Sequence, residues 1–172
     1  MLGTIDKLLA TVVATSMAAV VVRRLAPDDL PALLRLYAQL QPNDPHVEPA
    51  VLQRTWSRIT NDPGLIYVGV FIGPMLITTC HAALIPNLTH GARSYAVIEN
   101  VVTDHEHKRR GFGALAVRSL IALCWEADCY KVMLMSGTRR AEIHPFYDTL
   151  GFDRQAKQAF VLERPSPTPQ RG

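Results

Sequence analysis

The feature that most constrains the fold of this chain is a strand-to-helix junction between residues 94 and 128. Residues 94–103 (SYAVIENVVT) form a β-branched, apolar run that predicts a strand, interrupted by Glu99 and Asn100. A short polar turn follows, and residues 111–128 then carry the longest helical pattern in the chain. Residues 131–135 (KVMLM) have the composition of a strand buried on both faces. Strands and helices that alternate in this way predict an α/β fold.

The remaining periodic segments extend this sheet and cover it with helices. Further strands are predicted over residues 20–24, 65–71, 75–84 and 160–163. Helices are predicted from Asp28 or Asp29 to residue 40, over residues 49–60 and over residues 145–150. Gly73 and Pro74 supply a hairpin turn between two of the strands. The order of elements predicts one mixed sheet with helices packed on it.

The length of 172 residues fits one domain, which we expect to span residues 20–164. Residues 1–19 are predicted to be a poorly ordered extension, and the Pro-rich residues 165–172 a flexible tail. The apolar stretch 8–22 is shorter than the roughly 20 residues that a membrane span needs. It also has a weak basic start and no clean cleavage site for a signal peptide. We therefore expect that Met17 opens the natural domain and that the protein makes no membrane contact.

Composition narrows the function without defining it. The net charge of +3, from 18 basic and 15 acidic side chains, is too small to indicate nucleic-acid binding. The three cysteines, Cys80, Cys124 and Cys129, lack the spacing of a zinc site or disulfide framework, which favours a reducing, cytoplasmic setting. The six histidines show no metal-ligand spacing, so no metal is expected.

A basic, glycine-containing loop opens the long helix. It comprises Lys108, Arg109, Arg110, Gly111, Phe112 and Gly113, followed by Ala114. Backbone N–H groups at a helix start have no internal partner, and glycines let an anion approach them closely. The three cations add attraction for a polyphosphate. A solvated loop is the alternative, but the preceding strand, the following helix and the cations agree on a diphosphate cradle.

The loop matches neither of the two familiar phosphate motifs. A Walker A order is absent, and position 116 is alanine where the dinucleotide fingerprint requires its last glycine. Instead, residues 108–113 resemble the [QR]-x-x-G-x-[GA] signature of GNAT-superfamily N-acetyltransferases, with lysine in the first position. Residues 146–152 (FYDTLGF) are similar to the F-Y-x-x-x-G-F ending of the same family, about 34 residues later. Residues 98–102 and 129–132 also resemble the glucosamine-6-phosphate N-acetyltransferase subgroup.

This resemblance implies a single-domain fold with a mixed, mostly antiparallel sheet of six to seven strands. Helices are expected on both faces, and two central strands are expected to splay apart. It also implies acetyl-CoA as co-substrate, held by the main chain of Val101, Val102 and Thr103 and by the loop at residues 108–114. Arg140 stands where many relatives have an asparagine that contacts the cofactor, so its role is open. A homodimer is common in the family and rests here on resemblance alone.

Two residues are candidates for the chemistry that the resemblance implies. Tyr147 matches a tyrosine near the leaving sulfur, where a phenol can protonate a departing thiolate; packing beside Phe146 and Phe152 is its alternative role. Glu99, a carboxylate in an apolar strand, is a candidate base, and binding the acceptor or a nearby loop is equally open to it. Asn100 would be its neighbour on the substrate side. His81, His105 and His144 are weaker candidates.

Three functions follow from these residues. The first is transfer of an acetyl group from acetyl-CoA to a primary amine of a small molecule, directly in a ternary complex. The second is acetylation of a protein lysine or N-terminus. The third is a module that senses acetyl-CoA without turnover, which the pairing of Tyr147 with Glu99 disfavours. Nothing in the chain identifies the acceptor.

Overall fold

The computed structural model describes residues 19–137 and 143–164. Almost all of the predicted N-terminal extension, Met17, the predicted tail and Arg140 lie outside these residues. The chain divides into two compact units, residues 1–134 and residues 135–172, and each is described by itself. The prediction of one domain over residues 20–164 therefore stays a prediction.

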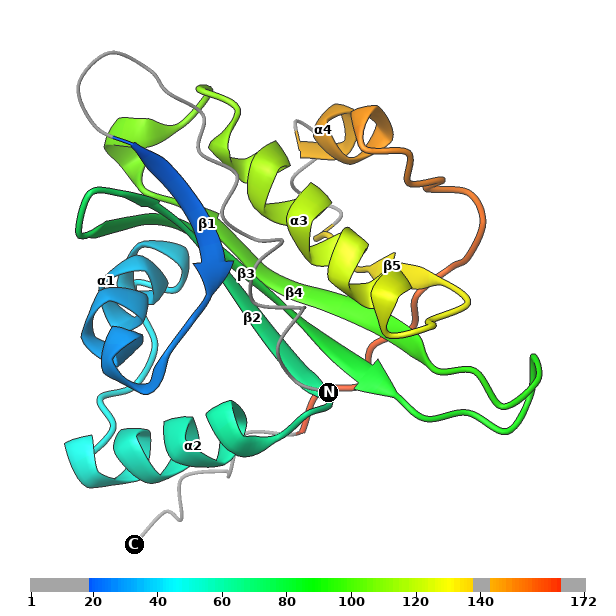
Figure 1. Ribbon diagram of the computed structural model, residues 1–172, viewed down its shortest axis with the longest axis horizontal. Coiled ribbons are helices and arrows are strands. Elements are labelled where there is room, and N and C mark those ends of the chain that lie inside the picture. The colour runs from blue at the N-terminus through cyan, green and yellow to red at the C-terminus, as the bar shows by residue number, and fades with distance from the viewer. Residues whose placement is uncertain (1–18, 138–142, 165–172) are drawn as a thin grey trace, which may run out of the picture. The chain divides into compact units, whose positions relative to one another are not determined.

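The first unit is built on one five-stranded sheet (Figure 1). Its strands, in sequence and in spatial order, are β1 (Val20–Arg24), β2 (Leu65–Ile72), β3 (Met75–Ile85), β4 (Tyr95–Thr103) and β5 (Val132–Leu134). The first three pairings are antiparallel, and β5 joins β4 in parallel. The sheet is therefore mixed and mostly antiparallel, as predicted.

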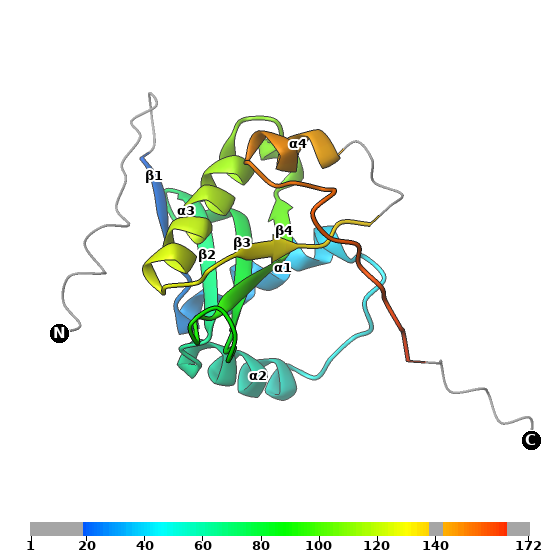
Figure 2. The same ribbon diagram turned by 90° about the vertical axis from the view of Figure 1, so that its right-hand side faces the viewer.

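Helices cover both faces of this sheet, which confirms that part of the prediction. The first unit contains α1 (Leu30–Leu40), α2 (Pro49–Asn61), α3 (Phe112–Glu126) and two short 3₁₀ turns, η1 (Pro27–Asp29) and η2 (His105–His107). Seen from the side, α3 lies on one face of the sheet and α1 on the other (Figure 2). Helix α3 is the connection between the parallel strands β4 and β5, as a crossover of this kind requires.

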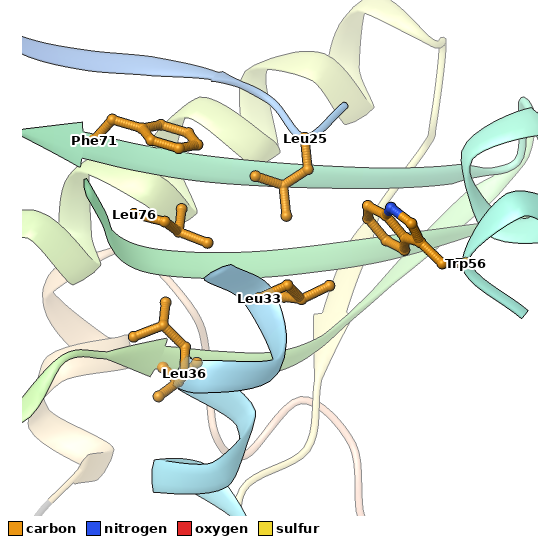
Figure 3. Close-up of a cluster of buried hydrophobic side chains, with 7 residues drawn as sticks. Leu25, Leu33, Leu36, Trp56, Phe71 and Leu76 are labelled. Carbon is orange, nitrogen blue, oxygen red and sulfur yellow. The ribbon is translucent and has the colours of Figure 1, made fainter. Parts of the chain in front are cut away.

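Alternating residues of the strands form a core on each face. Toward α1 lies a cluster around Leu33 and Leu36, three residues apart on that helix (Figure 3). Its other buried members are Leu25, Trp56, Phe71, Leu76 and Val102. Val68 and Val70 of β2 alternate with the strand residues that face α1, so their side chains point to the other face of the sheet. Both are fully buried, as is Val117 of α3.

The predicted strand over residues 160–163 is wrong, and with it the expectation of six to seven strands. No strand is assigned in the described part of the second unit, whose helix is α4 (His144–Thr149). Phe160 is 88% exposed, Val161 76% and Leu162 99%. Apolar composition favours a strand only where a partner edge is available to pair with it, and the exposure of these three side chains shows that composition alone did not decide the conformation of this segment.

Candidate active site

The basic loop before α3 has the backbone geometry of an anion site. Arg109 has a φ of 59°, and Gly111, the residue that precedes the helix, has a φ of 85°. Left-handed residues inside a turn direct successive backbone N–H groups into a common concavity. Gly111 supplies no side-chain cap to the helix start, and a Cβ at Gly111 would meet nothing within 4 Å. The backbone at the start of α3 therefore has room beside Gly111 for an anion to approach its first N–H groups.

The charge of the loop matches this geometry. Lys108, Arg109 and Arg110 are exposed, and none of them forms an ion pair with another described residue. The Arg110 guanidinium carbon lies 5.5 Å from the centre of the Phe112 ring. Three unpaired cations beside the positive end of the α3 dipole produce a local potential that favours a polyanion.

Strand β4, which leads into this loop, has a partly unpaired edge. Its ladder with β5 covers only Ala96–Ile98, so from Glu99 to Thr103 no described strand pairs with that side of β4. On its other side a β-bulge sets Asn100 and Val101 opposite the single residue Cys80. Asn100 takes a φ of 52°, which is strained for a residue with a side chain. Backbone groups of residues 101–103 on the unpaired edge can thus accept an extended ligand.

A row of polar side chains crosses the sheet next to this bulge. Tyr67, His81 and Glu99 stand directly opposite one another on β2, β3 and β4, and therefore on one face. The rings of Tyr67 and His81 stack with their centres 4.4 Å apart. Burial lowers the pKa of His81 to about 4 and raises the pKa of Glu99. Perturbed groups gathered in one place are typical of a functional site.

Two buried polar atoms near this row have no hydrogen-bond partner within the described part of the chain. They are the hydroxyl oxygen of Tyr37, on α1, and Nδ1 of His81. Burial raises the pKa of Tyr37, and its hydroxyl lies close enough to the side chains of Tyr67 and Asn100 for both to affect that pKa. Unpaired buried polar atoms are rare in folded proteins. Their position here marks the same region as Glu99 and Asn100.

Tyr147 belongs to the second unit, and its predicted role stays a prediction. It lies in α4, which begins at His144 with Pro145 in its first turn, as the sequence indicated. Its ring packs edge-on against Phe146, at 5.0 Å, and against Phe152, at 6.1 Å. Arg140 falls outside the described residues.

The three cysteines and His105 were also considered in the sequence analysis, and their contacts in the structure are as follows. Cys80, Cys124 and Cys129 are free and buried. His105 contacts Gln39 through Nδ1 at 3.2 Å. No three histidine, cysteine or acidic side chains of the described chain gather as metal ligands would, and none of its helices is long and apolar enough to cross a membrane. Sequence reasoning missed Asp104, a buried carboxylate at the end of β4.

The fold and the site together define a mixed α/β protein in which the fourth strand leads, through a bulge, into a basic loop at a helix start. Residues 30–152 match the acetyltransferase (GNAT) family. The chain belongs to this family, whose members use acetyl-CoA as co-substrate, and the family and co-substrate predicted from the sequence are confirmed.

Individual relatives agree with this assignment. The chain is 34% identical over 73 residues to a glucosamine 6-phosphate N-acetyltransferase of Trypanosoma brucei brucei, a match that covers 42% of this chain. The matched region is about half of that relative, 48% of its length. A solved acetyltransferase structure from Agrobacterium tumefaciens is 37% identical, with a TM-score of 0.79 over 83% of this chain and 99% of the other. Glucosamine-6-phosphate N-acetyltransferase from Arabidopsis thaliana shares the fold at 19% identity, with a TM-score of 0.72 over 84% of this chain and 97% of the other.

Proposed function

We propose that this protein transfers an acetyl group from acetyl-CoA to a primary amine of a small molecule, directly and in a ternary complex. The observation that carries the proposal is the continuity of β4 with the basic loop. Within one segment of about 15 residues, the chain presents a half-buried carboxylate at Glu99, an unpaired strand edge at residues 101–103 and an anion cradle at residues 108–114. Donor binding and proton transfer thus belong to one rigid element, which is what a direct transfer needs.

The residues have separate roles in binding acetyl-CoA. Main-chain groups of Val101, Val102 and Thr103 would pair with the pantetheine arm, while the cradle would hold the pyrophosphate. The Thr103 hydroxyl is already engaged with that of Thr78, at 3.1 Å, which supports a main-chain role for this residue. Arg140 is proposed to meet a phosphate or an acidic acceptor. Bound acetyl-CoA supplies the activated carbonyl carbon.

The chain's own groups would move two protons. As the amine nitrogen attacks, a bond forms between this nitrogen and the acetyl carbonyl carbon, and the bond between that carbon and the sulfur of coenzyme A breaks. The amine loses one proton to Glu99, directly or through water. Because burial raises the pKa of Glu99 above its ordinary value, its carboxylate is a better proton acceptor than an exposed one. The Tyr147 phenol would give a proton to the departing thiolate and recover one from water.

Glu99 has a second possible role as an ion partner of the acceptor, with Asn100 beside it. The two roles differ in the pH profile of Glu99→Gln. If Glu99 is the base, the variant loses the decrease of kcat at low pH that titration of this carboxylate causes. If Glu99 is an ion partner of the amine, the variant has a higher KM for the amine, and the pH profile of kcat is unchanged.

Relatives indicate the chemical class of the acceptor. The names of similar proteins mention glucosamine 6-phosphate and aminoglycosides, both of which carry amino groups on sugars. We therefore propose an amino sugar or a related small amine as acceptor. The three free, buried cysteines favour a reducing, cytoplasmic setting, and a homodimer is proposed from family membership.

The deciding experiment has two stages. Isothermal titration of the purified protein with acetyl-CoA should show binding, and no binding would refute the proposal. Release of coenzyme A is then measured with a panel of amino sugars, aminoglycosides, amino acids and lysine peptides. Turnover on a sugar amine supports the proposal. Turnover on peptides alone would indicate protein acetylation, and binding without any turnover would indicate a sensing module.

A further inference from the structure

A buried carboxylate lies between β4 and the basic loop and makes an unusual number of contacts. Asp104 is 3% exposed and directly follows the last residue of β4. Its Oδ1 accepts a hydrogen bond from the backbone N–H of Glu106, at 3.1 Å, and contacts Nδ1 of His107, at 3.3 Å. This oxygen therefore shapes the η2 turn from which the basic loop departs.

The second oxygen of Asp104 ties the same turn to α1. Oδ2 accepts hydrogen bonds from the Arg35 guanidinium, at 2.5 Å, and from the Gln39 amide, at 3.0 Å. The side-chain oxygen Oε1 of Gln39 in turn accepts a hydrogen bond from the backbone N–H of His105, at 3.0 Å. Arg35 also donates to the backbone carbonyl of Leu76 on β3. Two side chains from the middle and the C-terminal turn of α1 thus hold both the carboxylate and the backbone of the 3₁₀ turn.

The charge of this cluster is arranged so that it does not oppose an anion. Hydrogen bonds from Gln39 and Arg35 hold the pKa of Asp104 well below its ordinary value, so the carboxylate is ionised at neutral pH. An unpaired carboxylate there would repel a diphosphate bound a few residues later. Pairing with Arg35 neutralises it locally and leaves the three cations at 108–110 to set the potential of the loop.

We infer that Asp104, together with Gln39 and Arg35, is a positioning residue for the cofactor: it fixes the start of the basic loop so that the N–H groups of the cradle are preorganised for the pyrophosphate. The inference rests on the proposed function, because it assumes that the cradle binds acetyl-CoA. It assigns a role to Arg35 and Gln39 of α1, which hold the start of the basic loop without belonging to it. Preorganisation of a binding loop acts on affinity, since the ordering cost is met before the ligand arrives.

The test compares Asp104→Asn with a matched variant at the other end of α1. Asp29 also pairs with an arginine, since its two oxygens lie 2.6 and 2.9 Å from the Arg23 guanidinium, and it accepts the backbone N–H of Ala26. Among the described residues, Asp29 forms no hydrogen bond or ion pair with the basic loop. Both substitutions should lower the melting temperature, but only Asp104→Asn should raise the Kd of acetyl-CoA.

The expected increase in Kd is about ten-fold, the factor that corresponds to about 1.4 kcal/mol of lost preorganisation. In steady state the KM of acetyl-CoA should rise, while kcat at saturation stays within about two-fold. Gln39→Ala is the second variant, in case Asp104→Asn does not fold. It retains the Arg35–Asp104 pair, frees the His105 N–H and should raise Kd by about three-fold, or roughly 0.7 kcal/mol.

The outcomes separate the inference from the proposed function. If the wild type does not bind acetyl-CoA, both are overturned. If the wild type binds and both Asp104→Asn and Gln39→Ala bind equally well, only the positioning role is wrong. An equal loss of affinity in Asp29→Asn would also overturn it, because the effect would then follow general destabilisation.

Discussion

Replacing Gly111 by alanine separates the conformational role of this glycine from its role in anion binding. Gly111 and Gly91 both have left-handed backbones, with φ of 85° and 72°, and at both a Cβ would meet nothing within 4 Å. Gly91→Ala is therefore a matched control in the loop between β3 and β4. A left-handed alanine costs about 1–2 kcal/mol, offset by about 0.4–1 kcal/mol because the unfolded chain loses freedom. The net cost of each variant lies between about 0 and 1.6 kcal/mol, so about 1 kcal/mol is a fair working value.

This cost should lower the melting temperature of either variant by about 2–4 °C in a chain of this size. Calorimetric titration with acetyl-CoA should then distinguish them. In Gly111→Ala the new methyl group enters space that is open in the free protein and that the phosphates of bound acetyl-CoA are proposed to occupy, and we expect Kd to rise about ten-fold. Gly91→Ala should bind as the wild type does.

Gly111→Asp makes the test sharper. A carboxylate at this position can accept the first N–H groups of α3 itself, so it should stabilise the helix relative to alanine while it competes with the diphosphate. Binding should fall below detection without a lower melting temperature than that of Gly111→Ala. Unchanged affinity in a folded Gly111→Asp protein would refute the cradle at residues 108–114.

Three further predictions concern single side chains. Tyr147→Phe should lower kcat by about ten-fold or more and leave the Kd of acetyl-CoA unchanged, because the phenol acts only on the leaving thiolate; normal turnover would leave Tyr147 a packing residue. Glu99→Gln should lower turnover yet raise the melting temperature at neutral pH. Burial raises the folded-state pKa of Glu99, so its ionised form destabilises the fold as pH rises, and a lower melting temperature would contradict this reasoning. The pKa of His81 falls from 6.5 to about 4 on folding, so stability should decrease as pH drops through that window, by up to about 3 kcal/mol. Denaturant unfolding should show a weaker acid dependence in His81→Gln, and an equal dependence would exclude His81 as its source.

Local rules were sufficient where a segment's own residues decide its conformation. The long helix, its glycine start and the strand after it were predicted within a few residues of α3 and β5, but the prediction that this strand is buried on both faces is wrong, because Val132–Leu134 is only half-buried. The segment at residues 160–163 shows the opposite case, since its apolar composition favours a strand but the structure leaves it exposed. Pairing depends on an edge supplied by another part of the chain, which composition does not contain. The bulge at Asn100 is intermediate: the polar interruption was visible in the sequence, while the extra residue in β4 follows from its register with β3.

Asp104 shows most clearly where sequence reasoning stops in the site itself. An aspartate whose side chain accepts the N–H two residues later is a local turn signal, so the contact of Oδ1 with Glu106 could have been predicted from the residues after β4. The contacts of Oδ2 could not, because Gln39 and Arg35 lie 65 and 69 residues away. Only the first set shapes the turn, and only the second holds it in place. If preorganisation of the cradle depends on the second set, then part of the affinity for acetyl-CoA resides in α1, outside the two segments, residues 108–113 and 146–152, that carry the motif resemblance.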